Sequence, residues 1–200
     1  IVISHPDLDH YNAVAGLLER LPVGHVLLTN EFVRTESPTV KKVLDTISAL
    51  GVPVTILSGG DSVPCADLRI SFLKADAEPA SGLSDNEASV AAILEYRDRR
   101  ILLPGDLEGL GQLKLLPGLP PCDVLMSPHH GSPNSNVPAL AATVRPTHVI
   151  VSARNDRSRS HIARIFGSAS VLHTSTDGCV TAHVSPDGAL NVESFRAKEQ

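Results

Sequence analysis

The sequence predicts a mixed α/β (α+β) fold in one domain. Runs of branched apolar residues, which are typical of strands, alternate with helical stretches along the chain. Polar residues 96–100 join two strongly apolar runs, as in a hairpin, so antiparallel pairing is expected beside the βα alternation. The 200 residues can bury a sizeable core, and no repeat or long linker divides them.

The individual elements are predicted from their apolar content and from the residues that end them. Strands are expected over residues 1–4, 24–28, 52–57, 68–73, 88–96, 100–103, 123–126, 148–152, 170–173, 180–184 and 190–195. Ser37-Pro38 is an N-cap followed by a first-turn proline and opens a helix that Gly51 closes. Asp-Gly pairs at 177–178 and 187–188 mark turns, and residues 76–85 form the loosest stretch.

Composition and charge narrow the classes of function. The longest apolar runs are far shorter than the roughly 20 residues that span a bilayer, so no membrane segment is expected in this chain. Cys65, Cys122 and Cys179 lie far apart without a C-x-x-C pair, which predicts small buried residues rather than a zinc knuckle or a disulfide framework. A formal net charge of −5 argues against bulk attraction to nucleic acid, so a polyanion would need a local basic groove.

A run of metal-ligating residue types directly follows the first apolar stretch. The segment His5-Pro6-Asp7-Leu8-Asp9-His10 places two histidines and two aspartates in six positions without a cation. His5 and Asp7, at i and i+2 of an extended segment, would point to the same side. Asp9 and His10, on the loop entering the next helix, would diverge enough to reach a second ion. The spacing therefore favours a two-metal site over a solvated polar loop at a helix N-terminus.

Three later segments offer further ligands near apparent strand ends. Asp106 follows Gly105 at the end of an apolar strand, where a carboxylate could bridge two ions, although such a pair is also a common turn. His129 and His130 end the next strand, and adjacent histidines of this kind favour metal binding or catalysis. His161 follows a later strand and a polar loop, and it carries the weakest of these signals.

Five motifs stand in a fixed order along the chain. They are S-H-P-D-L-D-H, S-D-N-E-A-S-V, L-L-P-G-D-L-E, D-V-L-M-S-P-H-H-G-S and R-P-T-H-V-I-V-S. Together they resemble the metallo-β-lactamase fold and, more narrowly, the C-terminal metallo-hydrolase domain of ComEC-type DNA-internalisation proteins. Asp7 in place of the second histidine of H-x-H-x-D-H selects that branch, together with P-H-H-G-S. The resemblance implies an αββα sandwich over residues 1–200, truncated at its N-terminus so that the N-terminal strands are missing.

The resemblance also implies the residues of the site. The two divalent ions, zinc or manganese by the carboxylate-rich donor set, would be held by His5, Asp7, Asp9, His10, Asp106, His129 or His130, and His161. Asp106 would bridge the ions, Asp9 could also accept a proton, and Asn86 could position water or phosphate. The residues Tyr11-Asn12-Ala13 and Pro104 depart from the family pattern, as does the context of His161.

Two metal ions favour hydrolysis, and the resemblance implies a nuclease that acts on DNA during uptake. Arg154, Arg157 and Arg159 follow the strand at 148–152 and are expected to bind phosphates rather than bases. A hydrolase of a small ester or lactone would use the same ligands, and a non-catalytic binding module of the same fold is a third alternative. The resemblance further implies a soluble part of a larger bacterial inner-membrane protein, on its exoplasmic side.

Overall fold

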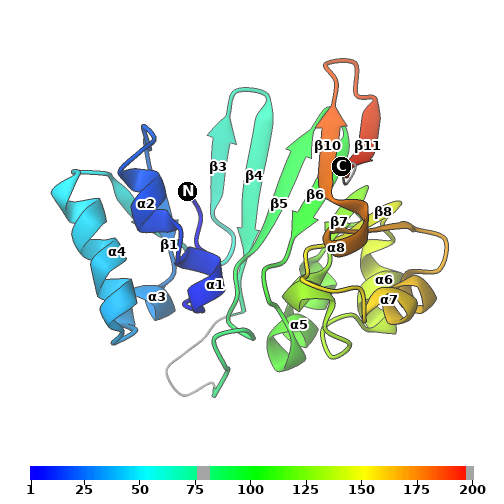
Figure 1. Ribbon diagram of the computed structural model, residues 1–200, viewed down its shortest axis with the longest axis horizontal. Coiled ribbons are helices and arrows are strands. Elements are labelled where there is room, and N and C mark those ends of the chain that lie inside the picture. Colours follow the sequence, from blue (N-terminus) through cyan, green and yellow to red (C-terminus); the bar gives the residue numbers. More distant parts are fainter. Residues whose placement is uncertain (76–81, 197–200) are drawn as a thin grey trace.

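The computed structural model describes residues 1–75 and 82–196, and its largest element is a seven-stranded sheet (Figure 1). The strands, in spatial order, are β3 (Ser62–Cys65), β4 (Leu68–Leu73), β5 (Ala91–Tyr96), β6 (Arg99–Leu103), β7 (Val124–Met126), β8 (His148–Val151) and β9 (Ser170–His173). Strands β3 to β6 pair antiparallel, and β6 to β9 pair parallel. Because parallel strands end at the same edge of a sheet, the segments after β6, β7 and β8 are neighbours.

A small parallel sheet and its helices form the N-terminal side of the molecule. The sheet pairs β1 (Val26–Leu28) with β2 (Val54–Ile56), and an isolated bridge joins Val2 to Leu27. Its helices are α1 (Leu8–Tyr11), α2 (Val14–Leu18), α3 (Asn30–Arg34) and α4 (Pro38–Ala49). The bridge at Val2 fixes the chain just before the acidic and histidine-rich segment, which therefore starts from a defined position.

The remaining helices connect the parallel strands or follow them. They are α5 (Gly109–Leu115), η1 (Leu116–Gly118), η2 (Pro128–Gly131), α6 (Pro138–Val144), α7 (Arg159–Phe166) and α8 (Thr174–Asp177). A separate hairpin of β10 (Cys179–Val184) and β11 (Leu190–Phe195) ends the described chain. Within the described ranges, no helix is long and apolar enough to cross a membrane.

Three apolar cores separate the four layers of the fold. One core lies between α2 to α4 and the small sheet and includes Val26 and Phe32. A second packs Leu27 and Leu57 of the small-sheet side against Phe72 of the large sheet. The third lies between the large sheet and α6 and α7. Helices, two sheets and helices thus follow one another, and the αββα arrangement implied by the resemblance is confirmed.

Most predicted strands are present, with ends that move by a few residues. Residues 1–4 form only the bridge at Val2, and β3 was not predicted because Pro64 interrupts its short apolar pattern. The helix predicted after Ser37 is present, but the Ser37 hydroxyl contacts Thr39 instead of capping the backbone. Residues 76–81 of the predicted loose stretch lie outside the described residues.

The cysteine prediction is only partly confirmed. All three thiols are free, and Cys122 is buried, whereas Cys65 and Cys179 are exposed. Cys65 lies at the outer edge of the large sheet and Cys179 in the two-stranded hairpin, where a small residue has little to pack against. Burial raises the pKa of the Cys122 thiol to about 12, so this thiol stays protonated and unreactive near neutral pH.

Candidate metal centre

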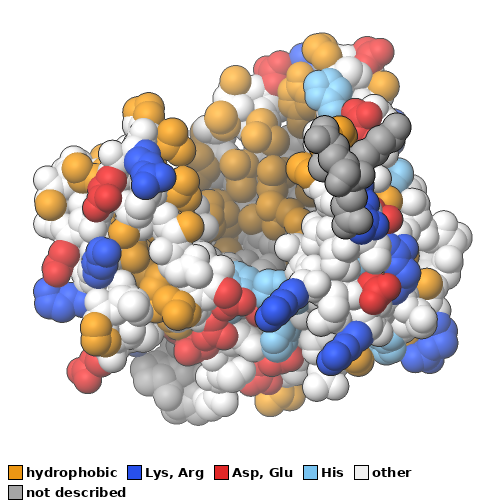
Figure 2. All heavy atoms as spheres, in the orientation of Figure 1, with side chains coloured by type: hydrophobic (Ala, Val, Ile, Leu, Met, Phe, Trp, Pro, Cys, Tyr) orange, Lys and Arg blue, Asp and Glu red, His pale blue; other side chains and the backbone are white. Residues whose placement is uncertain are grey.

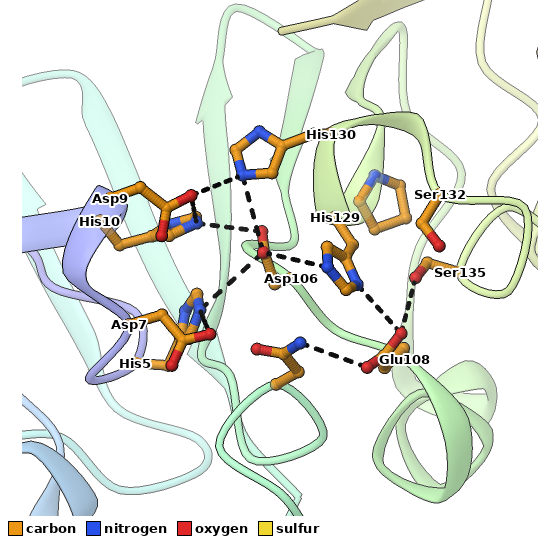
Figure 3. A network of polar contacts seen from close by, with 12 residues as sticks. His5, Asp7, Asp9, His10, Asp106, Glu108, His129, His130, Ser132 and Ser135 are labelled. Carbon is orange, nitrogen blue, oxygen red and sulfur yellow. Dashed lines mark hydrogen bonds and ion pairs between the residues drawn. The ribbon is translucent and has the colours of Figure 1, made fainter. Parts of the chain in front are cut away.

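Three segments far apart in the sequence bring histidine and aspartate side chains together (Figure 3). One contains His5 and leads into α1, the second follows β6, and the third is η2, directly after β7. The residues that meet are His5, Asp7, Asp9, His10, Asp106, His129 and His130. Asp9 and His10 lie within α1 and not on a loop before the helix, as the sequence had suggested. Figure 2 shows His and acidic side chains gathered in the middle of this face.

Asp106 stands at the centre of the cluster. Its side chain is only 7% exposed, and Oδ1 lies 3.2 Å from Nε2 of His10. The distances from Oδ2 to Nε2 are 3.9 Å for His5, 3.8 Å for His129 and 3.7 Å for His130. Four imidazole rings thus aim the same nitrogen at one carboxylate.

In His129 and His130, the opposite ring nitrogen is held by a protein group that fixes the orientation of the ring. Nδ1 of His130 donates to the backbone carbonyl oxygen of Ser152 at 2.9 Å. Nδ1 of His129 donates to Oε2 of Glu108 at 3.0 Å. A carbonyl oxygen and a carboxylate oxygen act as acceptors here, so the proton of each neutral ring is assigned to Nδ1. The lone pair of Nε2 then faces Asp106 in His129, and in His130 it faces both Asp106 and the Asp9 carboxylate, which is 3.2 Å away. Metal-ligating histidines require this orientation.

The distances between the central donor atoms suit a shared metal ion better than direct hydrogen bonds between the side chains. Nε2 of His5 and Nε2 of His10 are buried, and neither makes a well-aligned hydrogen bond to a described residue. Buried polar atoms normally have a partner, so two such orphans in one place need an explanation. Donors about 2.0–2.2 Å from a common ion lie roughly 3–4 Å apart, which matches the 3.2 and 3.9 Å that separate these nitrogens from Asp106.

The donors form two groups that share His10, and each group could hold a metal ion. The ligand atoms of His5, His10 and Asp106 lie within 4.8 Å of one another, and so do those of Asp9, His10 and His130. The Asp7 carboxylate lies 3.7 Å from His5 Nε2, and His129 reaches Asp106 from the Glu108 side. Imidazole and carboxylate donors of this kind suit zinc or manganese.

The loop that carries His129 and His130 has a strained backbone. Their φ angles are 49° and 51°, in the left-handed region that costs a residue with a Cβ about 1–2 kcal/mol. Gly131 follows with φ of 86°, and a Cβ there would come within 2.8 Å of Val151. Strain of this kind persists only where the surroundings impose it, and it is typical of functional sites.

The charges of the cluster shift the pKa values of its members in opposite directions. Burial raises the pKa of Asp106, but the contact with His10 and the nearby imidazoles outweigh burial and leave the pKa below its usual value. The Asp106 carboxylate raises the pKa of His10 despite the burial of that ring. Burial, followed by the charge of His10, lowers the pKa of His5. The cluster therefore prefers one proton on His10 and a neutral His5.

We expect His10 to titrate at higher pH than His5 in the metal-free protein. The protonated His10 stabilises the fold below its unfolded pKa of about 6.5, and this contribution is lost as pH rises through its raised folded pKa. His5 acts oppositely: its lowered pKa stabilises the fold above about 6.5, and that contribution is lost as pH falls. NMR titration of the imidazole resonances measures the order, and protonation of His5 before His10 would contradict it.

Two residues predicted from the sequence lie apart from the cluster. His161 is on α7, where Nε2 donates to the Asn136 carbonyl oxygen at 2.9 Å and Nδ1 contacts Arg164. Both of its ring nitrogens are therefore occupied, and the structure does not place His161 among the ligands. Arg159 binds Asp177 at 2.6 Å and also contacts the Thr176 hydroxyl, so its guanidinium is committed to a structural ion pair.

Asn86 and Arg154 border the cluster, and Glu108 was not predicted. Nδ2 of Asn86 donates to Glu108 at 3.2 Å, and its Oδ1 is buried without a partner in the described chain. Arg154 lines an open cleft of about 700 Å³, together with Asp9, His129 and His130. Arg157 is exposed and does not line that cleft. The contacts of Glu108 with His129 and Asn86 join segments 21 and 22 residues away, so no pattern within the L-L-P-G-D-L-E motif indicates them.

Comparisons with solved structures identify the fold of the chain. No family model and no curated protein matches the chain. Among solved structures, the metallo-β-lactamase fold protein YhfI of Bacillus subtilis is 13% identical, with a TM-score of 0.55 over 96% of this chain and 76% of YhfI. The diiron β-hydroxylase CmlA of Streptomyces venezuelae is 16% identical, with a TM-score of 0.54 over 86% of this chain and 42% of CmlA. The chain therefore has the metallo-β-lactamase fold, and at these identities the likeness shows the fold alone.

Proposed function

We propose that this protein is a dinuclear metal-dependent hydrolase. The observation that carries the proposal is the buried Asp106 carboxylate, at which four imidazole Nε2 atoms point from 3.2 to 3.9 Å. When bound there, two divalent ions would activate a water molecule and stabilise the negative charge that develops on the substrate. An intact set of oriented ligands argues against a binding module that has lost its metal.

The chain's own residues supply the remaining parts of such a reaction. Asp9, whose side chain is 64% exposed, faces both the cluster and the cleft and is the group that can accept a proton from the attacking water. Asn86 has a buried carbonyl oxygen beside Glu108 that makes no hydrogen bond to a described residue, and this oxygen can accept a hydrogen bond from a bound water. The open cleft, which Asp9 lines, gives a substrate access to the Asp9 carboxylate.

We further propose that the substrate is a phosphodiester, with DNA as the polymer that the ComEC-type resemblance favours. The cleft wall beside the histidines includes Arg154 and the polar residues Ser132, Asn155 and Ser158. A guanidinium and neutral donors suit a phosphate group, whereas a small neutral ester gains little from the cation. Contacts with phosphates carry no sequence information, so DNA binding through this cleft would not depend on the base sequence.

Arg154→Ala is expected to weaken DNA cleavage while leaving ester cleavage unchanged. If Arg154 meets one phosphate, the salt dependence of binding should flatten by about 0.7 in log–log slope for single strands. The experiment incubates zinc- or manganese-loaded protein with labelled single- and double-stranded DNA and with a small ester, each with and without chelator. Arg34→Ala, an exposed arginine on α3, is the control. Chelator-sensitive cleavage of the ester alone would replace the phosphodiesterase proposal with the esterase alternative.

A further inference from the structure

The strained histidine loop is held by one buried asparagine. Asn136 is fully buried, and its side-chain amide donates to the carbonyl oxygen of Pro128 at 3.0 Å and to that of Ser132 at 2.8 Å. Its Oδ1 accepts from the Ser127 hydroxyl at 2.8 Å. Ser127 and Pro128 precede the two histidines and Ser132 follows them, so one side chain ties both ends of the loop together.

The backbone of Asn136 is fixed as firmly as its side chain. Its N–H donates to the Ser132 carbonyl oxygen at 3.1 Å, and its own carbonyl oxygen accepts from His161 Nε2 at 2.9 Å. The residue before it is anchored as well, since the Gln112 amide donates to the Ser135 carbonyl oxygen at 2.8 Å and to that of Leu107 at 3.1 Å. Leu107 directly follows Asp106, so this scaffold joins the two ligand segments.

We infer that Asn136 is a positioning residue for the metal ligands His129 and His130, an inference that rests on the proposed metal site. Two consecutive left-handed residues with side chains are unfavourable, and the loop would relax without a restraint. The two amide hydrogen bonds of Asn136 close the loop on either side of these residues. The arrangement also accounts for His161, which supports Asn136 from behind and does not bind metal.

The test replaces Asn136 with aspartate and measures zinc affinity by calorimetric titration of the metal-free protein. The variant keeps the size of the side chain but puts an acceptor against the carbonyl oxygens of Pro128 and Ser132. We expect a 10- to 100-fold loss of zinc affinity, the range typical of residues that orient metal ligands. Asn134→Asp is the matched control, because Asn134 is exposed, lies two residues away and adds the same charge.

Ser127→Ala gives a milder second variant, since it removes only the hydroxyl that orients the Asn136 amide. It is expected to lower zinc affinity less than Asn136→Asp while its far-UV circular dichroism matches wild type, which keeps the inference testable if the aspartate variant fails to fold. Unchanged zinc affinity in a folded Asn136→Asp would overturn the role of Asn136 but not the metal site. If Asn136→Asp does not fold, unchanged zinc affinity in Ser127→Ala would overturn that role in the same way. A wild-type protein that binds neither zinc nor manganese would overturn the metal site and this inference together.

Discussion

Asp106→Asn is expected to abolish hydrolysis and to lower the affinity for divalent ions by at least about 100-fold. The amide keeps the shape of the side chain but removes the negative charge at which the Nε2 atoms of His5, His10, His129 and His130 point. If Asp106 contacts the metal ions directly, as proposed, its loss should cost more than the 10- to 100-fold typical of a residue that only orients a ligand. Calorimetry with zinc and manganese, alongside the DNA and ester assays, measures both effects.

The variant should fold, because the carboxylate contacts the imidazoles and not the apolar cores. The wild type should gain about 2.7 kcal/mol in free energy of unfolding at a metal concentration of 100 times Kd, and the variant should gain far less at the same concentration. Asp45→Asn, in an exposed pair with Lys41 on α4, is the control and should match the wild type. Undiminished metal affinity in folded Asp106→Asn would remove Asp106 from the centre of the site.

Sequence patterns predicted the strand ends well enough to indicate which histidines and aspartates lie close together. The run from His5 to His10, Gly105-Asp106 and the pair His129-His130 each follow a strand or bridge in the structure. Parallel strands β6 and β7 end at the same edge, so residues placed just after them must be neighbours. Residue types and their positions just after predicted strands were therefore enough to identify most residues of the cluster around Asp106.

Properties that depend on tertiary contacts could not be predicted in this way. His161 has a ligand's residue type and follows a polar loop after β8, but the turn of α7 points its Nε2 to a backbone carbonyl. Arg159 was predicted to bind phosphate, but its guanidinium instead binds Asp177, which lies 18 residues later in the sequence. No local pattern shows that the Asn136 amide closes a loop from eight residues away. In each case, the deciding contact is made by a backbone group or by a residue outside the motif.

Glu108→Gln is the second change with a large expected effect, because Glu108 holds His129 in position. Oε2 of Glu108 accepts from His129 Nδ1 at 3.0 Å and from the Ser135 hydroxyl at 3.3 Å, while Oε1 accepts from the Asn86 amide at 3.2 Å. Both oxygens thus face donors. A glutamine must place its NH₂ group either against His129 and Ser135 or against the Asn86 amide, which would then have to turn over.

The loss of negative charge also weakens the hydrogen bond that keeps the Nδ1 proton of His129 in place, and with it the basicity of Nε2. We therefore expect metal affinity and turnover to fall 10- to 100-fold in Glu108→Gln, with the far-UV circular dichroism of the wild type. Glu95→Gln, which breaks a partly exposed pair with Arg100, makes the same chemical change away from the site and should leave affinity unaltered. Glu108 contacts His129 through Nδ1, the ring nitrogen that faces away from Asp106. Unaltered zinc affinity in folded Glu108→Gln would therefore show that this hydrogen bond does not support metal binding through His129.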